Sequence, residues 1–216
     1  AGTAMEVWKN AGLPTNEGME KAGPCPTQDL VDSYEMANGE APITGYSDAD
    51  NLKPIVNAAS GYDENNPYAN RDPRFYASIY YNGAVRNLDQ PAGQKVETYV
   101  GGDDGISALD RTHTRTGYYL RKFNNYKSGQ NNNADGAIRL FRLAELYLNF
   151  AECAYQSAGP DVPVKIGERC MTARDAVAFV RARAGMPDFP TGLSKGAFEK
   201  KYRNERRVEF AFEEQQ

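Results

Sequence analysis

Apolar positions in the second part of the chain recur with the three- and four-residue spacing of helices. Between residues 137 and 158 they form two rows, which together cover more than half of a helical surface. Gly159-Pro160 is a strong signal for the end of this helix. So much apolar surface is typical of bundles and helical repeats, in which neighbours cover several sides. The rows are Phe141, Ala144, Leu148, Ala151 and Tyr155, and Leu140, Leu143, Tyr147, Phe150 and Ala154.

Two further helices are predicted after this one. Thr172 is a suitable N-cap for a helix that runs to Ala184, where Gly185 follows, and small apolar residues form its buried stripe. A third helix begins at Ser194 and carries many charges. No Gly or Pro stops it, so the sequence predicts that it continues to Gln216 and that the chain is cut at both ends.

The first part of the chain, residues 1–133, has only short apolar runs and holds most of the Gly, Asn and Tyr. Residues 74–81 and 118–123 are rich in strand-forming residues and are predicted as short strands. The connection between them is long, and such loops are often functional. We therefore predict a mainly α fold, with a loop-rich region at 1–133 containing a few short strands and a helical region at 134–216.

Charge and composition exclude several classes of protein. The chain has 25 basic and 29 acidic residues, a net charge of -4, which disfavours a nucleic-acid binder that depends on phosphate contacts. No window approaches the ~20 consecutive apolar residues of a membrane-spanning helix.

Cysteine and histidine are too sparse for most catalytic or metal sites built from them. The three cysteines form no C-x-x-C pair, and Cys153 falls in the apolar helix, where we expect it to be buried. The only histidine is His113, and nothing around it resembles a nucleophile elbow. A zinc site of Cys and His pairs and a Ser-His-Asp triad are both disfavoured, and no cofactor is expected.

Aromatic usage points to recognition by loops, with 14 Tyr and 9 Phe against 1 Trp. A sugar ring stacks its C–H face on an aromatic ring, while Asn, Asp and Arg form paired hydrogen bonds to its hydroxyls. Packing within loops is the alternative role for each tyrosine. The candidate binding residues are Trp8, Tyr81, Asn82, Arg86, Tyr99, Asp103 and Asp104.

Two groups of charges have competing interpretations. Asp103 and Asp104 lie side by side in a Gly-rich loop, where a turn, a weak Ca²⁺ site or an acid/base pair are conceivable, in that order. Charges on the helices are expected to form structural ion pairs. They are Arg142, Glu145 and Glu152, and Glu205, Arg206, Arg207 and Glu209, with an exposed pair between Glu199 and Arg203.

Six blocks of sequence resemble the SusD/RagB-like family of outer-membrane nutrient-binding lipoproteins of Bacteroidetes. Any one block is a weak match, but all six occur in the family's order between residues 24 and 213. They are PCPTQDLVDSYEMANG at 24–39, DPRFYA with YNG at 72–83, TGYYLRKF at 116–123, IRLFRLAELYLNFAE at 138–152, VRARAGMP at 180–187 and ERRVEFAFE at 205–213.

The resemblance implies the carboxy-terminal half of a SusD-like fold, with TPR-like helical repeats packed against a loop-rich region. It implies non-catalytic binding of a glycan, or less often a peptide, beside a SusC-like TonB-dependent transporter. It also implies a cell-surface location, with membrane attachment only through a lipid anchor. A glycoside hydrolase and a purely helical scaffold for protein partners are the alternatives from other classes. The resemblance locates the binding site only as loops.

Overall fold

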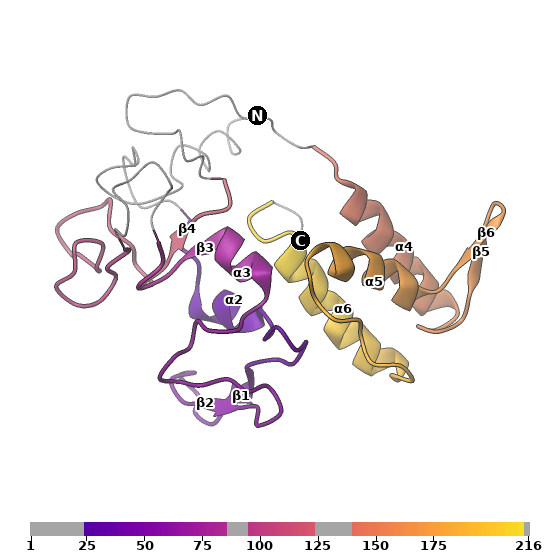
Figure 1. Ribbon diagram of the computed structural model, residues 1–216, viewed down its shortest axis with the longest axis horizontal. Coiled ribbons are helices and arrows are strands. Elements are labelled where there is room, and N and C mark those ends of the chain that lie inside the picture. The colour runs from indigo at the N-terminus through magenta and orange to yellow at the C-terminus, as the bar shows by residue number, and fades with distance from the viewer. Residues whose placement is uncertain (1–23, 86–94, 124–139, 214–216) are drawn as a thin grey trace. The chain divides into compact units, whose positions relative to one another are not determined.

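Helices form most of the regular structure in the computed structural model, which describes residues 24–85, 95–123 and 140–213 (Figure 1). The chain divides into two compact units. Unit 1 contains Ala1–Val31 and Phe75–Ile138, and unit 2 contains Asp32–Arg74 and Arg139–Gln216. Each unit therefore combines segments that are distant in the sequence. Unit 2 in particular takes in residues 32–74 from the loop-rich region as well as the helices.

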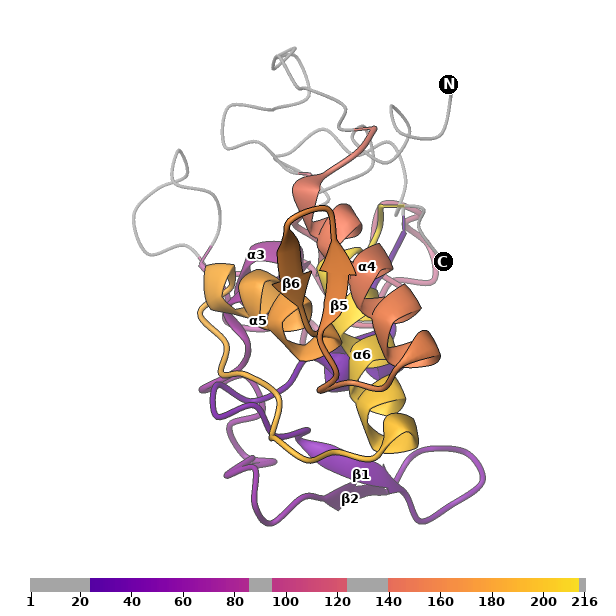
Figure 2. The ribbon, with the colours of Figure 1, turned by 90° about the vertical axis from the view of Figure 1, so that its right-hand side faces the viewer.

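Three helices form the core of unit 2: α4 (Leu143–Ser157), α5 (Ala173–Arg183) and α6 (Lys195–Glu209). Helix α4 packs against both α5 and α6, and Figure 2 shows the three side by side. Small residues such as Ala151 and Ala176 allow close approach, and aromatic side chains from α4 and α6 fill the remaining space. The largest core side chains are Leu148, Tyr155, Phe189, Phe198, Tyr202 and Phe210.

The predicted starts of α5 and α6 are confirmed, and each is fixed by a side-chain cap. The Thr172 hydroxyl accepts the N–H of Asp175, and the Asp175 carboxylate accepts the N–H of Thr172, which completes a capping box. The Ser194 hydroxyl accepts the N–H of Ala197 at the start of α6. Both caps satisfy amide groups that have no partner within the helix.

Helix α4 is shorter and less enclosed than the sequence suggested. It begins at Leu143 rather than near residue 137. The row that runs from Ala144 to Tyr155 is buried as expected, but Leu140 is 89% exposed. Phe141, Leu143 and Leu146 are exposed as well, so one side of α4 presents apolar residues to the surface among the described residues.

Helix α6 ends at Glu209 and does not continue as predicted. Phe210 leaves the helical conformation, and Phe212 has a φ of 65°. The side chain of Phe210 packs into the core of the three helices. The chain therefore turns inward at Phe210, and a buried aromatic side chain ends the helix in place of Gly or Pro.

A short antiparallel hairpin joins α4 to α5. Strands β5 (Val164–Ile166) and β6 (Arg169–Met171) pair with Val164 opposite Met171, and both of these side chains pack against the helices. Cys170 lies in this hairpin and Cys153 lies on α4, and both are free and exposed. The expectation of a buried Cys153 is therefore wrong, because the side chain is on the solvent side of α4.

The remaining part of unit 2 contains a second hairpin, formed by β1 (Ile43–Tyr46) and β2 (Pro54–Val56). It follows the short helix α2 (Gln28–Ser33), whose last two residues belong to unit 2. The Asp48 carboxylate accepts the N–H groups of Leu52 and Lys53 and so fixes the turn between the strands. Neither hairpin was predicted.

Helix α3 (Pro73–Ser78) has its first two residues in unit 2 and the rest in unit 1, where it continues directly into β3 (Ile79–Tyr80). The prediction of a strand over residues 74–81 is therefore wrong for most of its length. Asp72 is the reason, because its carboxylate accepts the N–H of Arg74 at 2.8 Å and caps the helix that Pro73 starts. Strand β3 pairs with β4 (Tyr119–Leu120), the central part of the second predicted strand.

The described residues thus form a mainly helical fold with three two-stranded pairs and no closed sheet. This agrees with the predicted class of TPR-like helices with a few short strands. Within the parts of the chain that the structure covers, no helix is both long and apolar enough to cross a membrane.

Candidate ligand-binding loop

A loop in unit 1 carries several of the predicted binding residues, and it is anchored where it starts, at Val96. Val96 is fully buried against Tyr80, Ala84 and Tyr119. Its N–H donates to the carbonyl of Ala84, and its own carbonyl accepts the N–H of Gly83, both at 2.8 Å. These contacts hold the chain at Val96 to strands β3 and β4, and the loop starts from that point.

The loop closes on itself between Glu97 and Asp104. The carbonyl of Glu97 accepts the N–H of Asp104 at 3.0 Å, and the Asp104 carboxylate accepts the N–H of Glu97 at 2.9 Å. A turn inside it has the N–H of Gly102 donating to the carbonyl of Tyr99. A Cβ atom at Gly102 would lie 2.4 Å from the Glu97 carbonyl oxygen, so only glycine fits at this turn.

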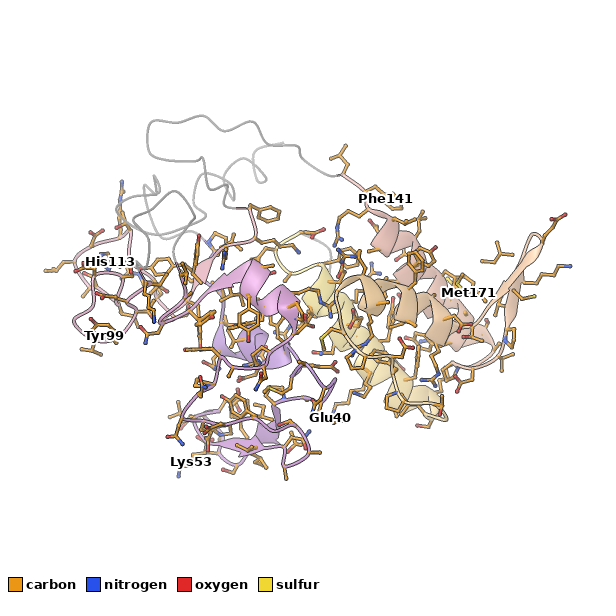
Figure 3. The ribbon with its side chains drawn as sticks, viewed as in Figure 1. Glu40, Lys53, Tyr99, His113, Phe141 and Met171 are labelled. Carbon is orange, nitrogen blue, oxygen red and sulfur yellow. The ribbon has the colours of Figure 1, made fainter. Side chains whose placement is uncertain are left out.

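The chain that returns to β4 adds a second set of hydrogen bonds. Tyr119 donates its hydroxyl to the carbonyl of Asp104 at 2.8 Å, and the same hydroxyl accepts the N–H of Thr114. His113 Nδ1 lies 2.5 Å from the carbonyl oxygen of Gly105. Figure 3 shows Tyr99 and His113 in the same loop-rich part of the chain. The loop that bears Tyr99 is therefore held from both of its ends.

Three predicted binding residues are exposed on or beside this loop. Tyr99 is 53% exposed, and Asp103 and Asn82 lie at the surface. Asn82 is connected to the loop, because its side-chain oxygen accepts the N–H of Thr98 at 3.1 Å. The structure thus brings together an aromatic ring, a carboxylate and an amide, the groups that recognise sugars.

The other four candidates have different placements. Asp104 is fully buried, and its carboxylate accepts a hydrogen bond from the N–H of Glu97. It therefore positions the loop and does not contact a ligand in this conformation. Tyr81 is half-buried and stacks on Phe75 with ring centroids 5.1 Å apart, which is a packing role. Trp8 and Arg86 lie outside the described residues.

Glu97 is a further polar residue near Tyr99 and was not among the binding residues predicted from the sequence. The negative charge of the Glu97 carboxylate raises the pKa of the Tyr99 hydroxyl above its ordinary value. Slight burial and the charge of Asp103 act in the same direction. The spacing of two residues between Glu97 and Tyr99 was the available signal, since it would place both on one face of an extended segment.

Large apolar side chains are also exposed in the same segment of the chain. Val100 and Leu109 are fully exposed, and Ile106 is mostly exposed. As for a metal, no group of three or more His, Cys, Asp or Glu side chains gathers in the described ranges. The Ca²⁺ alternative at Asp103 and Asp104 stays a prediction.

A second cluster of charges lies in unit 2, where residues from several of the six sequence blocks meet. Arg181 donates to Glu205 at 2.6 Å and to Glu35 at 2.7 Å. Arg74 donates to Glu205 at 2.6 Å and to Asp72 at 2.7 Å. Arg181, Glu35 and Asp72 are buried, and Arg74 is nearly buried.

Glu209 extends this cluster along α6 by one turn. It accepts from Arg74 at 3.0 Å, from Arg142 at 2.7 Å and from Arg183 at 2.5 Å. Arg142 also donates to Glu213 at 2.7 Å. The expectation that these charges form structural ion pairs is confirmed for Arg142, Glu205 and Glu209, and the exposed pair of Glu199 and Arg203 is confirmed as well.

Burial and ion pairing act in opposite directions on the pKa values of Glu209 and Arg74. Burial alone would raise the pKa of Glu209, but the hydrogen bond from Arg142 and the charges of Arg183 and Arg74 lower it below its ordinary value. Burial likewise opposes the charge on Arg74, and Glu205 and Asp72 outweigh it and raise the pKa of the guanidinium. A carboxylic acid that donates a proton needs a raised pKa, so the lowered pKa of Glu209 favours a structural role for this residue.

The comparisons with known proteins agree with this fold. A scan against protein families matches residues 3–216 to the SusD family, and a search of curated proteins finds no significant match. The chain is similar to the crystal structure of a SusD-like protein (BF3747) from Bacteroides fragilis NCTC 9343, with 31% identity and a TM-score of 0.69. That alignment covers 98% of this chain and 38% of the solved one.

A second solved structure, BT4246, is 23% identical with a TM-score of 0.65, and the alignment covers 95% of this chain and 36% of that one. At this identity it supports the fold alone. The chain spans less than two fifths of the length of the solved chains that it matches. Because the family match extends over almost every residue, the chain belongs to the SusD family.

Proposed function

We propose that the protein binds an oligosaccharide without cleaving it, as a nutrient-binding protein of the bacterial cell surface. Membership of the SusD family supports nutrient binding at the outer membrane. In this proposal the bound glycan passes to a SusC-like TonB-dependent transporter, and a lipid anchor attaches the protein to the membrane.

The observation that carries the proposal is the exposed ring of Tyr99 on a loop fixed by internal hydrogen bonds. The ring offers a flat apolar face to the C–H groups of a sugar, while Asp103 and Asn82 lie on the same loop and beside it to bond hydroxyl groups. The bonds of Asp104 and Tyr119 hold the loop before a ligand arrives, so binding costs little conformational entropy.

Three of the described carboxylates have structural partners, which favours binding over hydrolysis. A glycosidase needs two carboxyl groups facing each other at about 5–10 Å, one of them with a raised pKa. Glu205 and Glu209 are buried and bonded to arginines, and Asp104 is bonded to the backbone of Glu97. These three carboxylates therefore have structural partners in place of a substrate.

The test is a screen of soluble oligosaccharides on an array, followed by calorimetry of the hits with the protein and its variants. Tyr99→Ala is expected to weaken binding by about tenfold or more, because it removes the stacking surface. Tyr99→Phe should retain most of the affinity. Phe179→Ala is the matched control, since Phe179 is an equally exposed aromatic residue on α5.

The same screen separates the alternatives. Binding of peptides and of no glycan would replace the proposal by a peptide-binding member of the family. Release of shorter products from any polysaccharide would replace it by a hydrolase. For the transfer step, co-purification of the protein with a TonB-dependent transporter from outer membranes is the expected result.

A further inference from the structure

The loop that carries Tyr99 is supported at two consecutive carbonyl groups by side chains from the returning chain. The Tyr119 hydroxyl donates to the carbonyl of Asp104 at 2.8 Å, and His113 Nδ1 lies 2.5 Å from the carbonyl oxygen of Gly105. Since a carbonyl oxygen only accepts hydrogen bonds, Nδ1 carries the hydrogen of the imidazole ring. The closed part of the loop ends at Asp104, so residues outside the loop hold this end in place.

Thr114 determines where the Tyr119 hydroxyl points. The N–H of Thr114 donates to the Tyr119 hydroxyl oxygen at 3.0 Å, and the hydroxyl hydrogen is directed to the carbonyl of Asp104. All three residues are buried, so water does not replace these bonds and the loss of one is costly. A backbone amide, a side-chain hydroxyl and a loop carbonyl thus form one continuous chain of hydrogen bonds.

The side chain of Thr114 fixes the position of its own amide. Its hydroxyl donates to the carbonyl of Tyr118 at 2.7 Å and accepts the N–H groups of Thr116 and Gly117 at 3.1 and 3.2 Å. Gly117 has a φ of 85°, a left-handed conformation that glycine adopts without strain, and the chain then enters β4. The threonine side chain therefore closes the turn that holds the Thr114 amide against Tyr119.

We infer that Thr114 is a positioning residue of the candidate site, which acts through Tyr119 and makes the site selective among sugars. The inference rests on the proposed function, because it concerns the same loop. A backbone that holds the Tyr99 ring in one place favours sugars whose C–H face matches it, whereas a mobile loop adapts to several. Thr114 and Tyr119 are buried, so their effect reaches a ligand only through the loop.

Two nearly isosteric substitutions test this role. Tyr119→Phe keeps the ring and removes the hydroxyl, and Thr114→Val keeps the shape of the side chain and removes its hydrogen bonds. The wild type and both variants are compared on an array of gluco-, manno-, xylo- and galacto-oligosaccharides, with calorimetry of the hits that Tyr99→Ala weakens.

The expected result is a loss of selectivity. Affinity for the sugar that the wild type binds best should fall by about three- to tenfold in both variants, the effect of one or two lost hydrogen bonds. Affinity for the weaker sugars should fall less, so the range of sugars bound becomes broader. Thr114→Ser keeps the hydroxyl and should retain the wild-type selectivity.

Hydrogen exchange without a sugar shows whether the loop itself is loosened. The amides of Gly102 and Asp104 donate to the carbonyls of Tyr99 and Glu97 within the loop. Their exchange should be about threefold or more faster in Tyr119→Phe, and a saturating amount of the best sugar should restore the protection. Reduced affinity with unchanged exchange would overturn the inference, since Tyr119 would then act on the ligand and not on the loop.

Tyr202→Phe is the matched control. Tyr202 is also fully buried, and its hydroxyl donates to the carbonyl of Leu148 at 2.9 Å among the helices of unit 2. This variant should lower the melting temperature and leave both the selectivity and the loop exchange unchanged. If Tyr119→Phe did the same, the inference would be overturned and the proposed function would stand. A wild type that binds no oligosaccharide would overturn both.

Discussion

Arg74 and Glu205 are 131 positions apart in the sequence, and their side chains meet at 2.6 Å in the interior of unit 2. Arg74 stands at the start of α3, and Glu205 lies in the last part of α6. Asp72 holds the same guanidinium from the other side. Two of the six sequence blocks are therefore joined by a buried ion pair.

Removing the charge of Glu205 should destabilise the protein strongly. In Glu205→Gln, Arg181 and Arg74 both remain buried and lose a carboxylate partner. The expected loss in the free energy of unfolding is about 3–5 kcal/mol. Urea denaturation followed by circular dichroism measures it.

Glu199→Gln is the control for this substitution. Glu199 pairs with Arg203 on the exposed side of α6, and an exposed pair contributes little to stability. An equally small effect of Glu205→Gln would show that the buried cluster does not hold the helices together.

Stability should fall in acid because of Glu209. Its pKa is lower in the folded protein than the ordinary value of 4.5. The stabilisation is therefore complete above about pH 4.5 and is lost as the pH falls through the lower, folded value. Melting temperatures between pH 7 and pH 3 measure this loss. In Glu209→Gln the melting temperature is lower at neutral pH and falls less on acidification, and parallel curves for the two proteins would contradict the assignment.

Asp104 should affect binding without touching the ligand. Asp104→Ala removes the acceptor for the N–H of Glu97 and loosens the loop that carries Tyr99. The affinity for the glycan is expected to fall by about five- to tenfold. Asp104→Asn keeps a side-chain oxygen and should retain more of the affinity.

Hydrogen exchange at the Glu97 amide distinguishes this role from a direct contact. Exchange should be faster in Asp104→Ala than in the wild type even without a ligand. If affinity fell while exchange at Glu97 stayed the same, Asp104 would be a ligand contact and the loop would open when it binds.

Gly39 should not tolerate a side chain. Its φ is 83°, and a Cβ atom there would lie 2.8 Å from Cγ of Pro187. Gly39→Ala is expected to cost about 1–3 kcal/mol in the free energy of unfolding. Gly196→Ala offers the opposite case, because Gly196 lies in α6 with open space around it and alanine favours helices. A thermal melt should therefore show a lower midpoint for the first variant and a slightly higher one for the second.

The starts of helices were predicted well where the sequence has a residue that can cap a helix. Thr172 and Ser194 have the hydroxyl that a helix start requires, and both are N-caps in the structure. Asp72-Pro73 has the same kind of signal, but the strand-forming residues that follow it dominated the prediction. Capping by Asp72 outweighs that propensity over six residues.

Long-range effects could not be predicted in the same way. Leu140 and Cys153 belong to an apolar helical pattern, yet both are exposed. Periodicity does not show that the helix begins only at Leu143, nor which side of α4 has a neighbour. At the candidate site, the sequence named Asp103 and Asp104 together. Only the hydrogen bond between Asp104 and the Glu97 backbone separates their roles, with one at the surface and the other in the interior.

The shared carboxylates of α6 restrict how this sequence can vary. Glu205 forms ion pairs with both Arg74 and Arg181. Glu209 forms ion pairs with three arginines, Arg74, Arg142 and Arg183. Exchanging the two members of one pair, glutamate for arginine, would leave another arginine facing a like charge in the interior. No single compensating substitution repairs a loss at either glutamate, so the arginines of three distant segments can change only together.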